Sequence, residues 1–166
     1  MQLPVLSLRE NALLYIAKLI TGSIIVWYGL RAFGIAEPIW AMLSLIVVTE
    51  PDVTIAKNNF RARVINTLNG TVVACLALLV FGASFVAMLV AMTVSVLIAM
   101  SLQHYPTNWR LAPNTTVVLM SAALSGAVLS EEMRLAMVRV LEVMTGSTVA
   151  LLQTLAYGFL LRRWRA

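Results

Sequence analysis

The sequence predicts an all-α, polytopic membrane protein with six transmembrane helices. Three observations support this fold class: 61% of the 166 residues are hydrophobic, only 11% are charged, and six apolar stretches follow one another along the chain. Soluble domains carry about 25% charged residues, so this chain lacks the polar surface that would keep it in water. We expect one transmembrane domain over residues 1–166, surrounded by the lipid bilayer.

The six apolar stretches give the expected helices. A helix needs about 20 apolar residues to cross the hydrocarbon core of a bilayer. The first expected helix, 11–32, contains Lys18, and the second, 38–50, lies between two prolines and is short for a full crossing. The second stretch could therefore form a tilted helix, a broken helix or a re-entrant segment. The other four are expected at 58–81, 84–102, 112–130 and 136–161.

The basic residues predict that both termini are cytoplasmic. In this orientation two basic residues, Arg31 and Arg134, lie outside, and eight lie in cytoplasmic segments, as the positive-inside rule requires. These eight are Arg9, Lys57, Arg61, Arg63, Arg110, Arg162, Arg163 and Arg165. The net charge of +5 thus follows from membrane topology, and we expect no nucleic-acid partner.

Catalytic and metal-binding motifs are missing from the sequence. It contains no G-x-S-x-G, H-E-x-x-H, P-loop or C-x-x-C pattern. The single cysteine, Cys75, and the single histidine, His104, leave no set of metal ligands of these types. We therefore expect no enzymatic activity, no cofactor and no metal site.

An internal repeat divides the chain into two halves. The segment RVINTLNGTVVA, 63–74, aligns without gaps with RVLEVMTGSTVA, 139–150, at an offset of 76 residues. We expect repeats over 10–82 and 84–161. Because each would hold three helices, an odd number, the two halves would be inverted in the membrane, which is a signature of transporters.

Charged residues inside the expected helices are the first candidates for a transport path. Lys18 either extends its long stem to the cytoplasmic interface or faces a polar cavity. Arg63 and Arg139 each precede a repeat glycine by seven residues, and guanidinium groups suit carboxylates. For Arg63 the alternative is a topological anchor. For Arg139 it is an ion pair with Glu142 or Glu132.

Three further residues are candidates for the same path. Asn66 lies on the face that carries Gly70, where it either packs helices together or hydrogen-bonds a ligand. Glu50 is a candidate proton-coupling group, with capping or pairing to Arg61 as the alternative. Either Asp52 or Thr54 is expected to cap the helix that follows. Trp40 is either an aromatic-belt residue or a stacking surface for an aromatic ligand.

Two of these stretches together resemble a known family. PIWAMLSLIVVTEP, followed by RARVINTLNGTVVA, is similar to the fusaric acid resistance and aromatic acid exporter family, and more distantly to the aluminium-activated malate transporters. The matching features are Lys18, the Pro-x-Trp-Ala of 38–41, Pro51, Arg63, Thr67 and Gly70. Asn66 departs from the family pattern, which has glycine there, so either close helix packing is lost at this level or a polar lining replaces it.

The resemblance implies export of aromatic or other organic carboxylates across the bacterial inner membrane. A small organic anion is then the substrate, with Lys18, Trp40, Arg63, Asn66 and Arg139 as expected binding residues. A passive anion channel and a non-transporting assembly subunit are the alternatives. Family members often carry a second membrane unit or a cytoplasmic domain, so we expect this chain to form a homodimer or a larger homo-oligomer.

Overall fold

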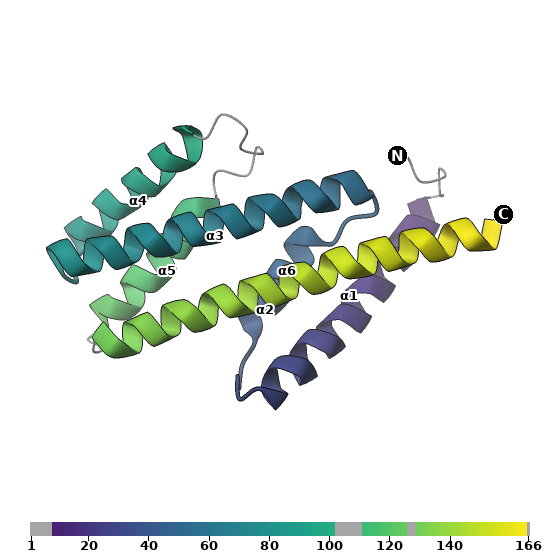
Figure 1. Cartoon of the computed structure of the whole chain (residues 1–166), viewed down its shortest axis with the longest axis horizontal. Coiled ribbons are helices and arrows are strands. Elements are labelled where there is room, and N and C mark those ends of the chain that lie inside the picture. Colours follow the sequence, from purple (N-terminus) through teal and green to yellow (C-terminus); the bar gives the residue numbers. More distant parts are fainter. Residues whose placement is uncertain (1–7, 102–110, 126–128, 166) are drawn as a thin grey trace. The chain divides into compact units, whose positions relative to one another are not determined.

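The computed structural model describes residues 8–101, 111–125 and 129–165, and within these ranges it contains six helices and no strands. The expected all-α fold with six helices is thereby confirmed (Figure 1). The helices are α1 (Leu8–Ala32), α2 (Ile39–Val48), α3 (Val53–Phe81), α4 (Phe85–Ser101), α5 (Ala112–Leu124) and α6 (Leu129–Arg165).

The six helices fall into two length classes. Three are long and apolar enough to cross a membrane, at Arg9–Ala32, Val53–Phe81 and Met133–Leu160. By contrast, α2 has 10 residues, α5 has 13 and α4 has 17. At 1.5 Å per residue α2 is about 15 Å long, roughly half the hydrocarbon thickness. This length agrees with the expectation that the second apolar stretch is short for a full crossing.

Local sequence signals explain several helix ends. Asp52 caps α3, because its Oδ1 accepts hydrogen bonds from the backbone N–H of Thr54 (2.7 Å) and of Ile55 (3.0 Å). The bond from Ile55, with that from Thr54, lowers the pKa of the Asp52 carboxyl from its ordinary value. After α1 and α3, Gly34 and Gly82 adopt positive φ angles of 85° and 69°, which glycine tolerates at helix C-termini.

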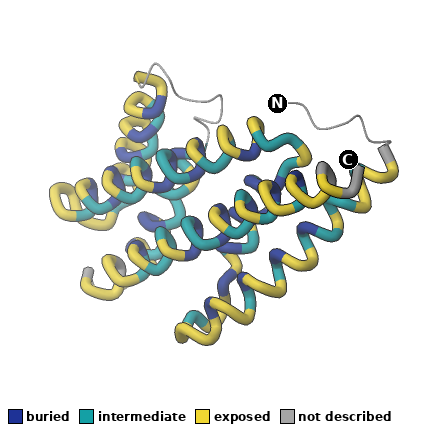
Figure 2. Tube along the Cα trace, turned by 45° about the vertical axis from the view of Figure 1, so that its right-hand side comes forward, coloured by how far each residue is buried: buried dark blue, intermediate teal, exposed yellow. Residues whose placement is uncertain are grey.

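The helices form two compact units. The first unit comprises residues 1–61 and 142–166, and the second comprises residues 62–141. Each unit therefore combines two whole helices with parts of α3 and α6. Exposed and buried positions alternate along every helix (Figure 2), and large apolar side chains such as Leu79 and Phe159 are more than half exposed. Apolar outer surfaces of this kind belong in lipid.

The first unit packs α1 and α2 against the C-terminal part of α6. Its core consists of Val26 and Leu30 of α1, Ala41, Leu45 and Val48 of α2, and Ala150 of α6. Two glycines permit close approach: a Cβ at Gly146 would overlap the carbonyl of Ala41, and one at Gly22 would lie 2.7 Å from Leu45. Because Gly146 lies against Ala41 and Thr154 bonds Glu50, α6 runs parallel to α2. Because Gly22 lies against Gln153 and Lys18 against Tyr157, α6 runs antiparallel to α1.

The second unit packs α3, α4 and α5 with the N-terminal part of α6. Its core consists of Val73, Ala74, Ala77, Ala87, Ala91, Leu119, Met120 and Ala136. Here Gly70 permits the close approach, since a Cβ would lie 2.6 Å from the carbonyl oxygen of Ala112. Thr116 then donates a hydrogen bond of 3.3 Å to the Gly70 carbonyl, which fixes the crossing of α5 and α3.

Candidate functional site

Lys18 lies buried inside the first unit. Its side chain is only 4% exposed, and its Nζ donates a hydrogen bond of 3.0 Å to the backbone carbonyl of Glu50. The same Nζ lies 5.8 Å from the centroid of the Tyr157 ring, within the range of a cation–π interaction. The stem of Lys18 therefore points into the first unit, toward the end of α2. Its role in a transport path stays a prediction.

The partner of Lys18 is the carbonyl group that follows α2. Glu50 precedes Pro51, and its carbonyl also accepts a hydrogen bond of 3.3 Å from Thr154 Oγ1 of α6. Donors from α1 and α6 thus meet at one oxygen atom. The Glu50 carboxylate adds a favourable charge interaction with Lys18.

A second polar contact between α1 and α6 lies one turn away. The side-chain amide of Gln153 is 2.9 Å from Thr21 Oγ1. Gly22 makes room for this amide, because a Cβ at Gly22 would lie 2.7 Å from it. Lys18, Thr21, Gln153 and Tyr157 therefore form a continuous polar strip within the first unit, in helices that are otherwise apolar.

The other predicted residues of the first unit are Glu50 and Trp40. Glu50 contacts Lys18 through its backbone oxygen, so the structure brings these two predicted residues together. Trp40 is half-buried in the first turn of α2, and its carbonyl accepts a hydrogen bond of 2.8 Å from Ser44 Oγ. Its part in ligand stacking stays a prediction.

The predicted residues of the second unit are Arg63, Asn66 and Arg139. Arg63 is 4% exposed and Asn66 is fully buried, with its Nδ2 donating a hydrogen bond of 2.7 Å to the Ala62 carbonyl. Arg139 is half-buried. Lys57, in contrast, is exposed, as expected of a topological charge.

Glu142 is a buried charged residue that the sequence reasoning treated only as a partner for Arg139. Its side chain is fully buried, and it follows Asn66, also fully buried, by the repeat offset of 76 residues. Glu142 precedes Gly146 by one turn, and Gly146 lies against the start of the parallel helix α2. A carboxylate is favourable near a helix N-terminus. The repeat alignment already contained the signal, since it places a polar residue at this position in both halves.

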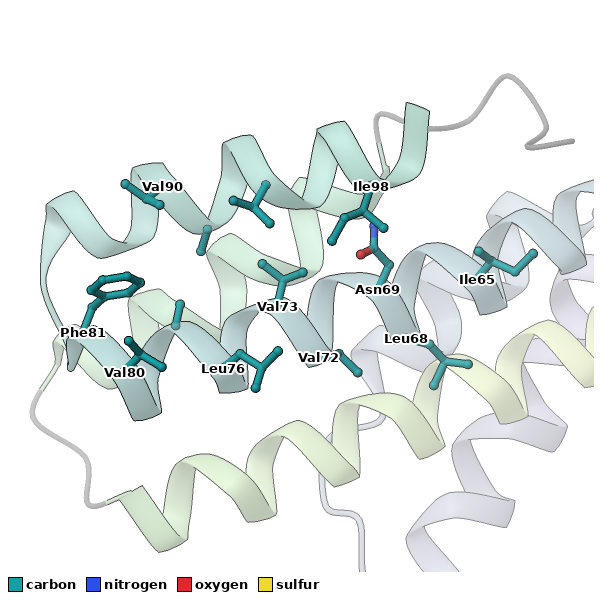
Figure 3. Close-up of a pocket in the computed structure, with 13 residues that line it drawn as sticks. Ile65, Leu68, Asn69, Val72, Val73, Leu76, Val80, Phe81, Val90 and Ile98 are labelled. Atoms are coloured by element: carbon teal, nitrogen blue, oxygen red, sulfur yellow. The ribbon is translucent and has the colours of Figure 1, made fainter. Parts of the chain in front are cut away.

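An apolar groove of about 540 Å³ runs between α3 and α4 in the second unit (Figure 3). Asn69 is its one polar lining residue, and the Nδ2 of this residue donates a hydrogen bond of 2.8 Å to the carbonyl of Ser95. The remaining lining includes Val72, Val80 and Val90. The lining of this groove offers a charged solute no charged partner. The candidate residues in each unit are therefore its own buried polar residues.

The composition of the described ranges also bears on metal binding. Within them no group of three or more His, Cys, Asp or Glu residues could hold a metal ion.

The comparison with known proteins identifies the family. Residues 20–153 match the family model described as fusaric acid resistance protein-like. The chain belongs to the fusaric acid resistance protein-like family. No curated protein and no solved structure matches the chain. The resemblance noted in the sequence is thereby confirmed, and family membership together with the apolar helices indicates a membrane protein with a role in transport.

The matched range leaves part of the candidate site outside. Lys18 precedes it by two residues, and Thr154 and Tyr157 follow its end. The family match therefore does not include these residues, and only the structure shows their contacts. Arg63, Asn66, Arg139 and Glu142 lie within it.

Proposed function

We propose that this fusaric acid resistance-like protein exports organic carboxylate anions, aromatic ones among them, across a bacterial inner membrane. The family supports the transport role, and the buried basic residues Lys18 and Arg63 support an anionic solute. We further propose that the two repeats are inverted with respect to each other. The equivalent glycines Gly70 and Gly146 support the repeat, since each lies against an alanine carbonyl at the start of a short helix.

The surroundings of Lys18 are the observation that carries the anion assignment. An ammonium group inside a membrane helix is costly to bury and is a candidate functional residue. Here the hydrogen-bond partner of Lys18 is a backbone carbonyl and its other neighbour is an aromatic ring. Neither the carbonyl nor the ring carries a formal charge, and the Glu50 carboxylate acts on Lys18 as a nearby charge. A solute carboxylate can add a charged hydrogen bond to Lys18. Arg63, which is also buried, adds a second positive charge in the other unit.

Flux into proteoliposomes tests this function. The purified protein is reconstituted, and uptake of labelled benzoate and succinate is measured against concentration. We expect saturable flux for the parent protein. Lys18→Gln should raise the half-saturating concentration on the order of tenfold, because it removes a charged hydrogen bond. Arg31→Gln is the matched control, since Arg31 is exposed and its guanidinium stacks on Trp27, 5.4 Å from the ring centroid.

Three outcomes would contradict the proposal. Flux that never saturates and follows only the electrochemical gradient would indicate a passive channel. The absence of carboxylate flux in the parent protein would indicate a non-transporting subunit. Equal flux in Lys18→Gln and the parent would show that Lys18 has only a structural role.

A further inference from the structure

Glu142 is placed unlike the other acidic residues of the chain. Six of the seven acidic residues lie in the first turn of a helix or between helices: Glu10, Glu37, Glu50, Asp52, Glu131 and Glu132. Glu142 instead follows Met133, where the apolar span of α6 begins, by nine residues, which is about 14 Å along the helix. Its side chain is fully buried. One carboxyl group is thus buried deep inside an apolar span.

Few buried charges occur on the helices that pack with α6. The short helices α2, α4 and α5 contain no charged residue. Lys18 of α1 lies beside Tyr157, fifteen residues beyond Glu142 and therefore about 22 Å farther along α6. Among the other charged side chains that the structure describes, Arg63 is buried, Glu50, Asp52 and Arg139 are half-buried, and the rest are exposed. The cation nearest to Glu142 in the sequence is Arg139, three residues earlier on α6.

The repeat shows that a neutral side chain is sufficient at the equivalent position. Asn66 precedes Glu142 by the offset of 76 residues, is also fully buried, and donates a hydrogen bond of 2.7 Å to the Ala62 carbonyl. Packing at this level of the second unit therefore needs a polar group but no charge. A carboxyl group adds one property that an amide lacks, since it exists both with and without a proton.

Ionisable residues inside membrane helices are costly, and acidic ones mark proton relays in pumps and transporters. A carboxyl group in such a place is stabilised either by a cation or by a proton that makes it neutral. Glu142 is therefore suited to change its charge during a transport cycle, whereas Asn66 keeps the equivalent position of the other half neutral.

We propose, building on the carboxylate export proposed above, that Glu142 binds and releases the proton that couples this transport to the proton gradient. Uptake of the proton forms one O–H bond on the Glu142 carboxylate and leaves the side chain neutral. Release of the proton restores the charge, and no other bond changes. A proton that enters in this way while a carboxylate leaves makes the inward proton gradient drive export. Glu50, the coupling candidate from the sequence, is only half-buried at the end of α2.

Proteoliposomes that contain labelled succinate and a trapped pH-sensitive dye test this role. An external medium more acidic than the lumen should accelerate succinate efflux through the parent protein, and the lumen should acidify as succinate leaves. Glu142→Gln keeps the shape of the side chain but cannot ionise. This variant should still exchange succinate across the membrane without a pH gradient, but it should lose both the acceleration and the acidification.

Two further variants complete the test. Glu131→Gln is the matched control, because Glu131 is exposed and forms an ion pair of 3.1 Å with Arg134, so its coupling should equal that of the parent. Glu142→Asp keeps a carboxyl group at a slightly different place. It should retain proton-coupled efflux, with a shifted pH midpoint, and it decides the question if Glu142→Gln does not insert.

The results separate this proposal from the proposed function. Parent-like acceleration and acidification in Glu142→Gln would overturn the role of Glu142, and so would an unchanged pH midpoint in Glu142→Asp. Loss of coupling in Glu50→Gln but not in Glu142→Gln would assign the proton to Glu50 instead. If the parent transports succinate without moving protons, only the coupling is wrong. If the parent carries no carboxylate at all, the proposed function fails.

Discussion

Two basic residues near the start of α3 carry the same charge in different surroundings. Arg63 is 4% exposed, whereas Lys57 is exposed. We predict that Arg63→Gln weakens the apparent affinity for benzoate on the order of tenfold, because a charged hydrogen bond is worth about 1.5–3 kcal/mol where water is excluded. Lys57→Gln should change it little, since exposed charges are screened by salt. Proteoliposome flux of the two variants measures the difference.

Expression and membrane insertion of both variants serve as the control for this pair. Arg63 is only a topological anchor if Arg63→Gln inserts normally and transports benzoate with the parent affinity.

For individual residues, the sequence predicted the candidate positions but not the contacts that those residues make. Lys18 stood out because a charge interrupts an apolar helix, but its long stem could reach either an interface or the interior. That choice depends on where the end of α2 lies, which is a tertiary fact. Glu142 was named only as a partner for Arg139, because its burial is not visible in a sequence.

Gly146 and Gly29 lie in long helices but differ in their neighbours. We predict that Gly146→Ala destabilises the protein by about 1–3 kcal/mol, because its Cβ would overlap the Ala41 carbonyl and force α6 away from α2. Gly29→Ala is the matched control on α1, since nothing lies within 4 Å of a Cβ there. That variant should be neutral or more stable by up to about 1 kcal/mol.

Thermal unfolding in one detergent, followed by circular dichroism, compares these two alanine variants with the parent. Equal melting temperatures for Gly146→Ala and the parent would mean that α6 and α2 adjust without cost, and that the close contact does not stabilise the first unit.

The elements themselves were largely predictable. Proline on both sides limits α2, and residues 112–124 of the fifth expected helix are helical. The expected helix 112–130 ends at Leu124 in the structure, before residues 126–128, which lie outside the described ranges. Apolar content alone could not locate that end, because after Ser125 and Gly126 the apolar stretch resumes with Ala127, Val128 and Leu129.

For the whole molecule, the sequence predicted one transmembrane domain but not its two compact units. Their boundaries fall at residues 61–62 and 141–142, in the middle of continuous helices. A boundary inside a helix has no linker composition, glycine or proline to mark it. The repeat alignment marks these boundaries more closely than any composition signal, because the aligned segments 63–74 and 139–150 begin within three residues of them.

The arrangement of the first unit also bears on topology. Because α1 and α6 run antiparallel, with Lys18 beside Tyr157, the start of α1 and the end of α6 lie at the same end of this unit (Figure 1). Apart from Lys18 and Arg139, eight of the ten basic residues are placed in the cytoplasm when this end faces inward. We therefore predict that both termini are cytoplasmic and that residues 33–37 and 82–84 face outward.

Cysteine labelling in intact cells measures this topology on a Cys75→Ser background. A membrane-impermeant maleimide should label Ala36→Cys and Ala83→Cys directly. Asn58→Cys and Arg163→Cys should react only after the membrane is permeabilised, because their positions would lie inside. All four positions are exposed in the structure, so burial within the protein does not limit the reaction. Direct labelling of Arg163→Cys from outside would reverse the orientation and with it the proposed direction of transport.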